Sequence, residues 1–243
     1  MSAISITTPN PSAKTAPEAH ALRQMGFWSA FLSALFGIGF NLAVVIMYTS
    51  LPKAESAAGW TGITSYLETF EAVLLLPLVP SLLLVPAFTA MMVCVHYYAQ
   101  PAKRLWSHLG LAFALIYAVM AFMNYSTQLL SVQRAILAGE TDGLAMLVHG
   151  NPHAIFWSLV SGYIFMNLAM LFATPVFAGG KLETWTRRFF LLNGGSVVLT
   201  TASVCIDNPL VFNLLSVLVW SPLFAIATGL LAVLFARLDV RNG

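Results

Sequence analysis

The sequence predicts an all-α polytopic membrane protein, a bundle of six transmembrane helices. Three observations predict this class. Six apolar stretches are near or above the ~20 residues that a helix needs to cross ~30 Å of hydrocarbon. Hydrophobic residues make up 59% of the 243 residues and charged residues only 8%, against roughly 25% charged in a soluble domain. Nine of the eleven Lys and Arg residues fall on one side if all six stretches span the membrane.

The chain is expected to form one membrane domain between two short tails. Residues 1–22 are rich in Ser, Thr, Pro and Ala and have no apolar signal-peptide core, because the apolar run begins only after Arg23. We expect them to form a disordered cytoplasmic tail, and residues 239–243 a second one. The domain between them covers residues 23–238. Its predicted spans are residues 25–49, 71–99, 106–130, 154–178, 189–206 and 210–238.

The distribution of charge predicts the orientation, since Lys and Arg in short loops are retained on the cytoplasmic side. With both termini in the cytoplasm, only Lys53 and Arg134 are external. The internal cations are then Lys14, Arg23, Lys103, Arg104, Lys181, Arg187, Arg188, Arg237 and Arg241. Most acidic residues lie on the external side, namely Glu55, Glu68, Glu71, Glu140, Asp142 and Asp207.

The first span carries small or polar residues at intervals of four. These are Ser29, Ser33, Gly37 and Asn41. Such a stripe is typical of a close helix–helix contact, because small side chains let two backbones approach. We expect Asn41 to form a hydrogen bond across that contact.

The second span has an unusual start. Ser65 and Glu68 have the spacing of a capping box, in which both side chains bind free backbone amides. Pro77, Pro80 and Pro86 each remove a backbone hydrogen bond, so the span should be kinked or locally unwound. Irregular backbone at membrane depth is tolerated only against protein or a water-filled cavity, which makes this helix a candidate cavity wall. The alternative is a bent helix packed against its neighbours.

Polar side chains gather in the external halves of the third, fifth and sixth spans, where apolar surroundings make them costly unless they meet one another or water. One interpretation is an outward-opening polar pocket. The alternative is a set of hydrogen bonds between helices, each contributing roughly 0.6 kcal/mol. The candidate ligand-binding residues are Glu68, Asn124, Tyr125, Gln128, Thr200, Ser203 and Trp220.

Two acidic residues are candidate proton donors. Glu71 follows the predicted capping turn and lies at the edge of the hydrocarbon, where a desolvated carboxyl group would retain its proton. Asp207 lies at the external end of the fifth span. Cys94 and Cys205 are expected at opposite ends of the bundle, too far apart for a disulfide.

The loop between the third and fourth spans, residues 132–153, is amphipathic. We expect short interfacial helices there, interrupted by Gly139 and Gly143, which could form a lid over the pocket. Pro152 is expected to start the next helix. His149 and His153 are four residues apart, but the intervening Gly and Pro disfavour a helix that presents both to one metal. We therefore predict no metal site.

Standard catalytic motifs are absent from the sequence. It contains no phosphate-binding Gly-rich loop, no His-Glu-x-x-His zinc motif and no Gly-x-Ser-x-Gly turn. We predict no cofactor and no nucleic-acid partner; the expected partners are membrane lipids and a small hydrophobic ligand.

The third and fourth spans resemble a group of uncharacterised six-span bacterial and archaeal integral membrane proteins. About a quarter of the chain carries this resemblance. In the group, an Asn-Tyr-x-x-Gln helix leads to a Gly-Glu-x-x-Gly-Leu loop, an Asn-Pro-His-x-Ile-Phe helix start and a Gly-Tyr pair. The matching residues are Asn124, Tyr125, Gln128, Gly139, Glu140, Gly143, Leu144, Asn151, Pro152, His153, Ile155, Phe156, Gly162 and Tyr163.

The resemblance implies the six-span fold and a bacterial or archaeal plasma membrane, but no established activity. The relatives carry an acidic residue shortly before the Gly-Tyr pair, where this chain has Leu159, Val160 and Ser161. If that acid is functional in the relatives, this protein has lost it or moved its role elsewhere.

Two functional classes follow from these patterns. The first is a non-enzymatic protein that binds or moves a small apolar or amphipathic molecule through the polar pocket. No inverted repeat relates the two halves of the chain, which weakens a transporter interpretation. The second is an intramembrane enzyme for a lipid or isoprenoid, in which Glu71 or Asp207 would start an isomerisation or cyclisation by protonation.

Overall fold

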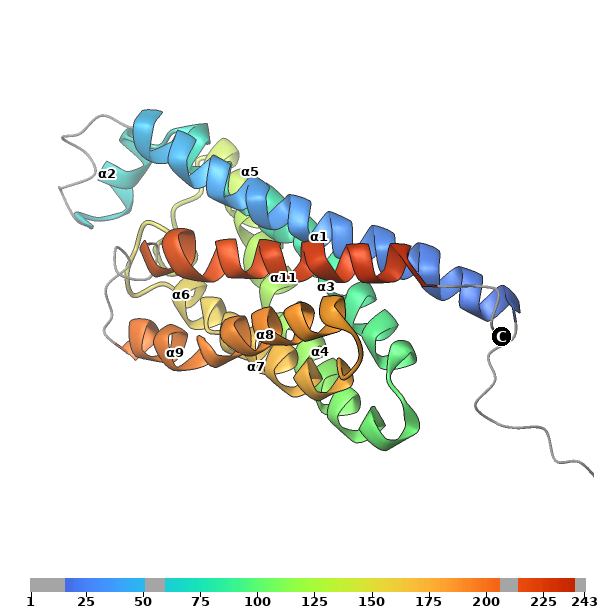
Figure 1. Ribbon diagram of the computed structural model, residues 1–243. Helices are drawn as coiled ribbons and strands as arrows, with labels where there is room; N and C mark the ends of the chain where they lie inside the picture. The colour runs from blue at the N-terminus through green and yellow to red at the C-terminus, as the bar shows by residue number, and fades with distance from the viewer. Residues whose placement is uncertain (1–15, 51–59, 206–213, 239–243) are drawn as a thin grey trace, which may run out of the picture.

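The computed structural model describes residues 16–50, 60–205 and 214–238 (Figure 1). These residues form helices and turns and contain no strand, which confirms the all-α class. The elements are α1 (Ala16–Ser50), α2 (Ile63–Glu68), η1 (Ala72–Leu75), α3 (Leu78–Tyr98), η2 (Pro101–Lys103), α4 (Arg104–Ser126), η3 (Thr127–Val132), α5 (Gln133–Ala138), η4 (Leu144–Met146), α6 (Ile155–Val160), α7 (Gly162–Ala173), η5 (Thr174–Val176), α8 (Lys181–Gly195), α9 (Val197–Cys205), η6 (Ser216–Trp220) and α11 (Ser221–Ala236). The segments η3 and η6 are π-helical.

Among the described residues, five helical segments are long and apolar enough to cross a membrane. They are Pro17–Ser50, Ala72–Tyr98, Pro101–Ala138, Ile155–Val176 and Ser216–Ala236. These segments match the predicted first, second, third, fourth and sixth spans and indicate a membrane-embedded protein. The predicted fifth span, residues 189–206, is not among these five. Residues 189–205 belong to α8 and α9, which are separated at Ser196, and residue 206 lies outside the described residues.

Two helices are longer than predicted. Helix α1 begins at Ala16, so residues 16–22, predicted to be disordered, are helical. The third span continues beyond residue 130 through η3 and α5 to Ala138, and ends where Gly139 adopts a left-handed conformation with φ of 72°. Its 38 residues correspond to roughly 57 Å, almost twice the ~30 Å of the hydrocarbon. The rest of the predicted amphipathic loop contains only the short η4.

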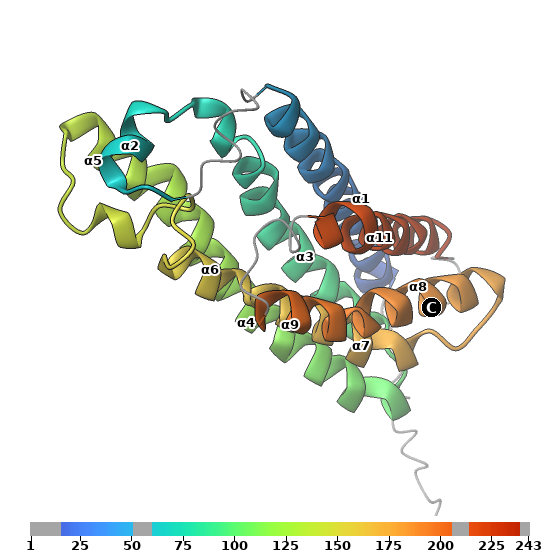
Figure 2. The same cartoon turned by 90° about the vertical axis from the view of Figure 1, so that its left-hand side faces the viewer.

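The long helices form a closed ring. Helix α1 packs against α3 and α11, α4 packs against α3 and α7, and α8 packs against α7 and α11. The order around the ring is therefore α1, α3, α4, α7, α8 and α11, as Figures 1 and 2 allow the reader to follow. Helix α8 thus occupies the sixth position of the bundle, although it is shorter than the other five segments.

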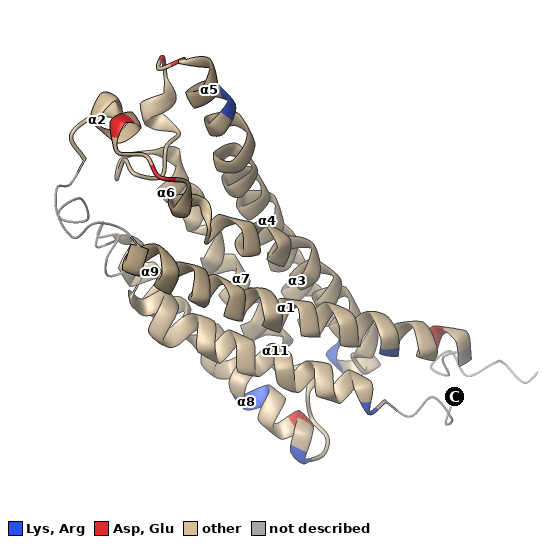
Figure 3. Cartoon of the chain, turned by 90° about the horizontal axis from the view of Figure 1, so that it is seen from above, with Lys and Arg blue, Asp and Glu red and all other residues tan. Residues whose placement is uncertain are grey.

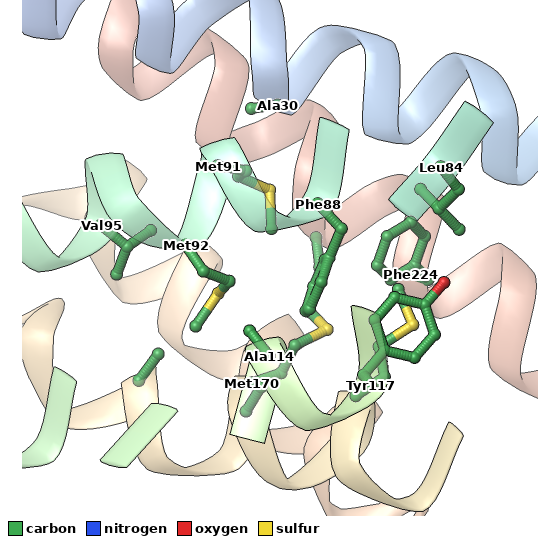
Figure 4. Packing of buried hydrophobic residues seen from close by; sticks show 14 of the residues in the cluster. Ala30, Leu84, Phe88, Met91, Met92, Val95, Ala114, Tyr117, Met170 and Phe224 are labelled. Carbon is green, nitrogen blue, oxygen red and sulfur yellow. The ribbon is translucent and has the colours of Figure 1, made fainter. Parts of the chain in front are cut away.

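Aromatic and methionine side chains fill the centre of the ring (Figure 4). The ring centroid of Phe88 lies 5.4 Å from that of Tyr117 and 6.0 Å from that of Phe224. All three side chains are fully buried. This contact joins α3, α4 and α11, so the bundle has one shared core rather than separate helix pairs.

The stripe of small residues on α1 lies in a helix contact, as predicted. Ser29 and Ser33 are buried. A Cβ atom on Gly37 would lie 3.1 Å from the ring of Phe224, and the Gly37 carbonyl accepts a hydrogen bond of 2.9 Å from Ser221 of α11. The hydrogen bond predicted for Asn41 is not formed by its Oδ1, which has no partner among the described residues.

The start of the second span differs from the prediction in one respect and agrees in another. The capping box is wrong: α2 begins after Gly62, and no side chain caps it, because Ser65 already lies inside the helix. The predicted unwinding is confirmed, since η1 ends before Pro77 and α3 starts after it. Pro80 lies in the first turn of α3, and only Pro86 lies in the helix interior.

The two cysteines lie as expected. Both are free; Cys94 is buried in α3 near its Tyr98 end, and Cys205 is exposed at the last residue of α9.

Two neighbouring glycines test how tightly α7 and α8 pack. A Cβ atom on Gly194 would lie 2.6 Å from the backbone nitrogen of Leu171, so Gly194→Ala should separate the two helices. We expect the free energy of unfolding to fall by roughly 1–3 kcal/mol. A Cβ atom on Gly195 meets nothing within 4 Å, so Gly195→Ala should be neutral or slightly stabilising. Thermal unfolding in detergent compares them; equal effects would contradict this packing.

Candidate functional site

The two ends of the bundle differ in charge (Figure 3). One end, called here the basic end, contains the starts of α1, α4 and α8 and the end of α11. It carries Arg23, Lys103, Arg104, Lys181, Arg187, Arg188 and Arg237. The opposite end, called the cap end, contains α2, α5 and η4. Among the described residues there, Arg134 is the only Lys or Arg, and the acidic residues are Glu68, Glu71, Glu140 and Asp142.

The two glutamates at the cap end lie outside the core. Glu68 ends α2 and is exposed. Glu71 is also exposed and occupies the extended position before η1. The structure therefore does not place the Glu71 carboxyl in the desolvated setting that its proposed role as a proton donor requires. The other candidate donor, Asp207, lies outside the described residues.

Asn167 is the centre of a hydrogen-bond network in the core. Its side chain is fully buried in α7. Its Nδ2 donates to the Thr200 hydroxyl at 2.8 Å, and its Oδ1 accepts from the Trp220 indole N–H at 2.7 Å. The carbonyl of Trp220 in turn accepts a hydrogen bond of 3.0 Å from Nδ2 of Asn193. One network therefore joins α7, α8, α9 and η6.

This network explains three of the candidate ligand-binding residues. Thr200 and Trp220 bond to Asn167, and Ser203 donates to the carbonyl of Thr200 at 2.8 Å. The bonds of Thr200 and Trp220 match the alternative that polar side chains connect helices, whereas the Ser203 bond lies within α9. Asn167 and Asn193 were not among the candidates predicted from the sequence. Their signal was a single Asn within an apolar span, which marks a buried hydrogen bond as readily as a binding site.

A pair of tyrosines extends the polar region into α4. The hydroxyl groups of Tyr125 and Tyr163 are 2.5 Å apart. The ring of Tyr163 stands edge-on to Trp220 with centroids 4.8 Å apart, and lies 5.7 Å from the ring of Tyr117. Tyr163 thus connects the candidate Tyr125 on α4 with the candidate Trp220 on η6.

Asn124 differs from the other buried candidates because its side-chain amide bonds to none of the described residues. Only 1% of its surface is exposed, and neither its Oδ1 nor its Nδ2 has a hydrogen-bond partner in the described part of the chain. The hydroxyl of Tyr117, two helical turns away on the same buried face, has no partner there either. A buried polar group left in this state costs about 1–3 kcal/mol. These atoms can therefore bond to a molecule that enters the bundle.

Gln128, in the π-helical turn η3 that continues α4, connects the third span to the loop that follows α5. Its Nε2 donates to the carbonyl of Leu147 at 2.5 Å, and its Oε1 accepts from the backbone N–H of His149 at 3.2 Å. Asn151 folds the same loop, since its Nδ2 donates to the carbonyl of Ala145 at 2.7 Å. The amide of Gln128 therefore supports the loop.

The loop and α2 together form a small domain-like cover, called here the cap (residues 60–70 and 139–153). A hydrophobic cluster joins the cap to η3: Leu144 and Val148 of the cap are buried with Val132 of η3, and Trp60 and Tyr66 pack against them. The Tyr66 hydroxyl lies 3.3 Å from Nδ1 of the partly buried His149. Burial raises the pKa of Tyr66 and lowers the pKa of His149 to about 4. Both side chains are therefore neutral at neutral pH.

Breaks in helical regularity concentrate in the half of the bundle nearest the cap. The second span unwinds at Pro77, and the fourth and the α8–α9 segment are interrupted at Ser161 and Ser196. The third and last segments contain the π-helical turns η3 and η6. Turns of this kind occur frequently at functional sites. The candidates Gln128 and Trp220 lie within these two turns.

No group of three or more His, Cys, Asp or Glu residues in the described ranges is placed to hold a metal ion. The buried polar side chains described above are neutral amides and hydroxyl groups that lie beside aromatic rings.

The pH dependence of the cap should follow His149. Because its pKa is lower in the folded cap than the usual value near 6.5, protonation favours the open loop. Cap stability should be complete above pH 6.5 and fall as the pH drops toward 4, by up to about 1.4 kcal/mol per pH unit. Hydrogen exchange of residues 140–150, corrected for intrinsic rates, measures this. His149→Gln should remove the dependence; if the slope persists, another group is responsible.

Comparison with known proteins identifies no relative. No family model, no curated protein and no solved structure matches this chain. Its function is therefore inferred from its own residues.

Proposed function

We propose that this protein is a six-span membrane protein whose cap-end half binds a small apolar or amphipathic molecule. The observation that carries this proposal is the side-chain amide of buried Asn124, which bonds to none of the described residues and lies in the half of the bundle where several spans lose helical regularity. The membrane is the plasma membrane of a bacterium or archaeon, with both termini in the cytoplasm.

The ring of helices supports six crossings. Helix α8 occupies a full position between α7 and α11, and α9 continues from it toward the cap end, beside α7. The α8–α9 segment runs from the basic end toward the cap end. Added to the five long segments, it gives six crossings. Seven Lys and Arg residues at the basic end favour a cytoplasmic location for that end, by the positive-inside rule.

The irregular backbone supports a binding role for the cap-end half. Non-helical backbone at membrane depth is tolerated where it is buried in protein or lines a cavity. The side-chain amides of Asn167, Asn193 and Gln128 form hydrogen bonds within the protein near these irregular segments. These three amides therefore have a structural role. The amide of Asn124 has no such structural role, since it bonds to no described residue of a neighbouring helix or of the cap. Binding of a molecule with both a donor and an acceptor group would satisfy it.

Membership of the uncharacterised six-span group remains part of this proposal, and several of the residues behind the resemblance contact one another. Gln128 binds the loop that Asn151 folds, and Tyr125 bonds to Tyr163. These contacts give the pattern a structural reason, the attachment of the cap to the third and fourth spans. The alternative of an acid-dependent enzyme has less support, since Glu71 is exposed.

Substitution of Asn124 should separate binding from stability. In Asn124→Leu, a buried amide without partners is replaced by an apolar side chain of similar size. We expect folding to be unchanged or stabilised by roughly 1 kcal/mol, while a ligand that co-purifies with the wild type is lost. Native mass spectrometry and extraction of the purified protein measure occupancy, and thermal unfolding measures stability.

Asn167→Leu is the matched control. It makes the same chemical change on a neighbouring helix, but leaves the donors and acceptors of Thr200 and Trp220 without their partner. Its free energy of unfolding should fall by roughly 2–4 kcal/mol. If Asn124→Leu retains full ligand occupancy, or is destabilised as much as the control, the binding proposal is wrong.

The topology can be tested separately. Green fluorescent protein fused to either terminus should fluoresce, because both ends are expected in the cytoplasm, whereas alkaline phosphatase at the same positions should be inactive. A cysteine at Glu140 in the cap should react with a membrane-impermeant maleimide added to intact cells. An external location of either terminus would refute the six-span arrangement.

A further inference from the structure

One exposed face of α8 changes from cationic to apolar along its length. Lys181, Trp185, Arg188 and Leu192 are spaced by four, three and four residues and therefore lie along one side of the helix. All four side chains are exposed. The charged part of this face lies at the basic end, and its apolar part lies further along the helix, nearer the midpoint between the two ends of the bundle.

The two residues at the centre of this face are held together. The guanidinium carbon of Arg188 lies 4.9 Å from the centroid of the Trp185 ring. This cation–π contact limits the freedom of a long side chain, so Arg188 is partly ordered before anything binds to it. Indole rings favour the depth of lipid head groups. The pair therefore marks where α8 crosses the membrane surface.

The acid of α8 bonds elsewhere. Oε1 of Glu183 accepts a hydrogen bond from the Tyr98 hydroxyl, and its Oε2 accepts from the backbone N–H groups of Ala178 and Gly179. The carboxylate is thereby used to shape the turn that precedes α8. The side chains of Lys181 and Arg188 are exposed and face outward.

We propose that this face of α8 binds one anionic phospholipid of the leaflet at the basic end. Lys181 and Arg188 bind the phosphate from either side of Trp185, and Leu192, one turn further along the helix, contacts an acyl chain. The guanidinium fork suits phosphate oxygens. A free phosphate ion would use only the two cations, whereas a lipid also uses the apolar continuation of the same face. The lipid is therefore the ligand that matches the whole stripe.

The test uses the purified full-length protein in detergent with equal amounts of phosphatidylglycerol and phosphatidylcholine of identical acyl chains. Native mass spectrometry counts the retained lipids. Since a basic residue near an anionic surface contributes about 1 kcal/mol, two should give a preference for phosphatidylglycerol of roughly 30-fold. The double variant Lys181→Gln with Arg188→Gln should retain both lipids equally, and Arg188→Lys should keep part of the preference.

The matched control removes two charges from the same end but from another helix. Lys103→Gln with Arg104→Gln should preserve the preference. Equal losses in both double variants would mean diffuse attraction to the basic end and would overturn the site, as would a preference that survives loss of Lys181 and Arg188. Inorganic phosphate that competes as well as phosphatidylglycerol would assign a small anion instead. If the double variant unfolds, the single variant Arg188→Gln, at an exposed position, is used instead, and it should lose part of the preference for phosphatidylglycerol.

Discussion

The side-chain amide of Asn167 is the interaction on which closure of the bundle depends. It bonds simultaneously to Thr200 of α9 and Trp220 of η6 from its own position on α7. In hydrocarbon no water can replace these bonds, so the helices that carry the partners are held at one mutual position. The break at Ser196 and the π-helical turn in η6 both lie beside this network, which explains how the bundle accommodates irregular backbone there.

The same chemistry organises the cap, with the backbone as partner. Gln128 reaches the loop through a carbonyl and an N–H group, and Asn151 folds the loop on itself. The long α4–η3–α5 helix lifts this structure beyond the hydrocarbon. Amides thus have two roles, one joining helices in the core and one fixing the external loop. Among the described residues the amide of Asn124 on α4 takes part in neither group, and the proposed binding role rests on that amide.

Much of the architecture was predictable from the sequence because hydrocarbon length and apolar composition leave few alternatives. Five of the predicted spans appear as helical segments long enough to cross a membrane. The missed boundaries have local correlates. The third span ends only at Gly139, where a residue in left-handed conformation stops the helix. The segment α8–α9 is interrupted at Ser196, which lies between Gly194, packed against Leu171 of α7, and Thr200, bonded to Asn167 of α7. The pattern of Ser65 and Glu68 did not form a capping box because α2 begins one turn earlier, after Gly62.

The candidate site shows a sharper limit. Spacing identified Asn124, Gln128, Thr200 and Trp220 as polar residues on buried faces, but a helix pattern does not distinguish an amide that bonds to a neighbour from one that does not. Asn167 and Asn193 were recognised only through their hydrogen-bond partners. Glu71 carried the right chemistry in the sequence, yet the chain places it on the surface before η1.

Composition and charge therefore determined by themselves that this chain is helical, that most of it is apolar enough for a membrane, and that its cations gather at one end. Those properties depend on the composition of each segment, on the positions of charged residues along the chain and on the helical period, all of which can be read from the sequence. Only the tertiary structure decided which polar groups satisfy one another, because a hydrogen bond depends on the positions of two atoms that can lie far apart in the chain. The difference between Asn124 and Asn167, two buried amides in apolar spans, exists only in three dimensions.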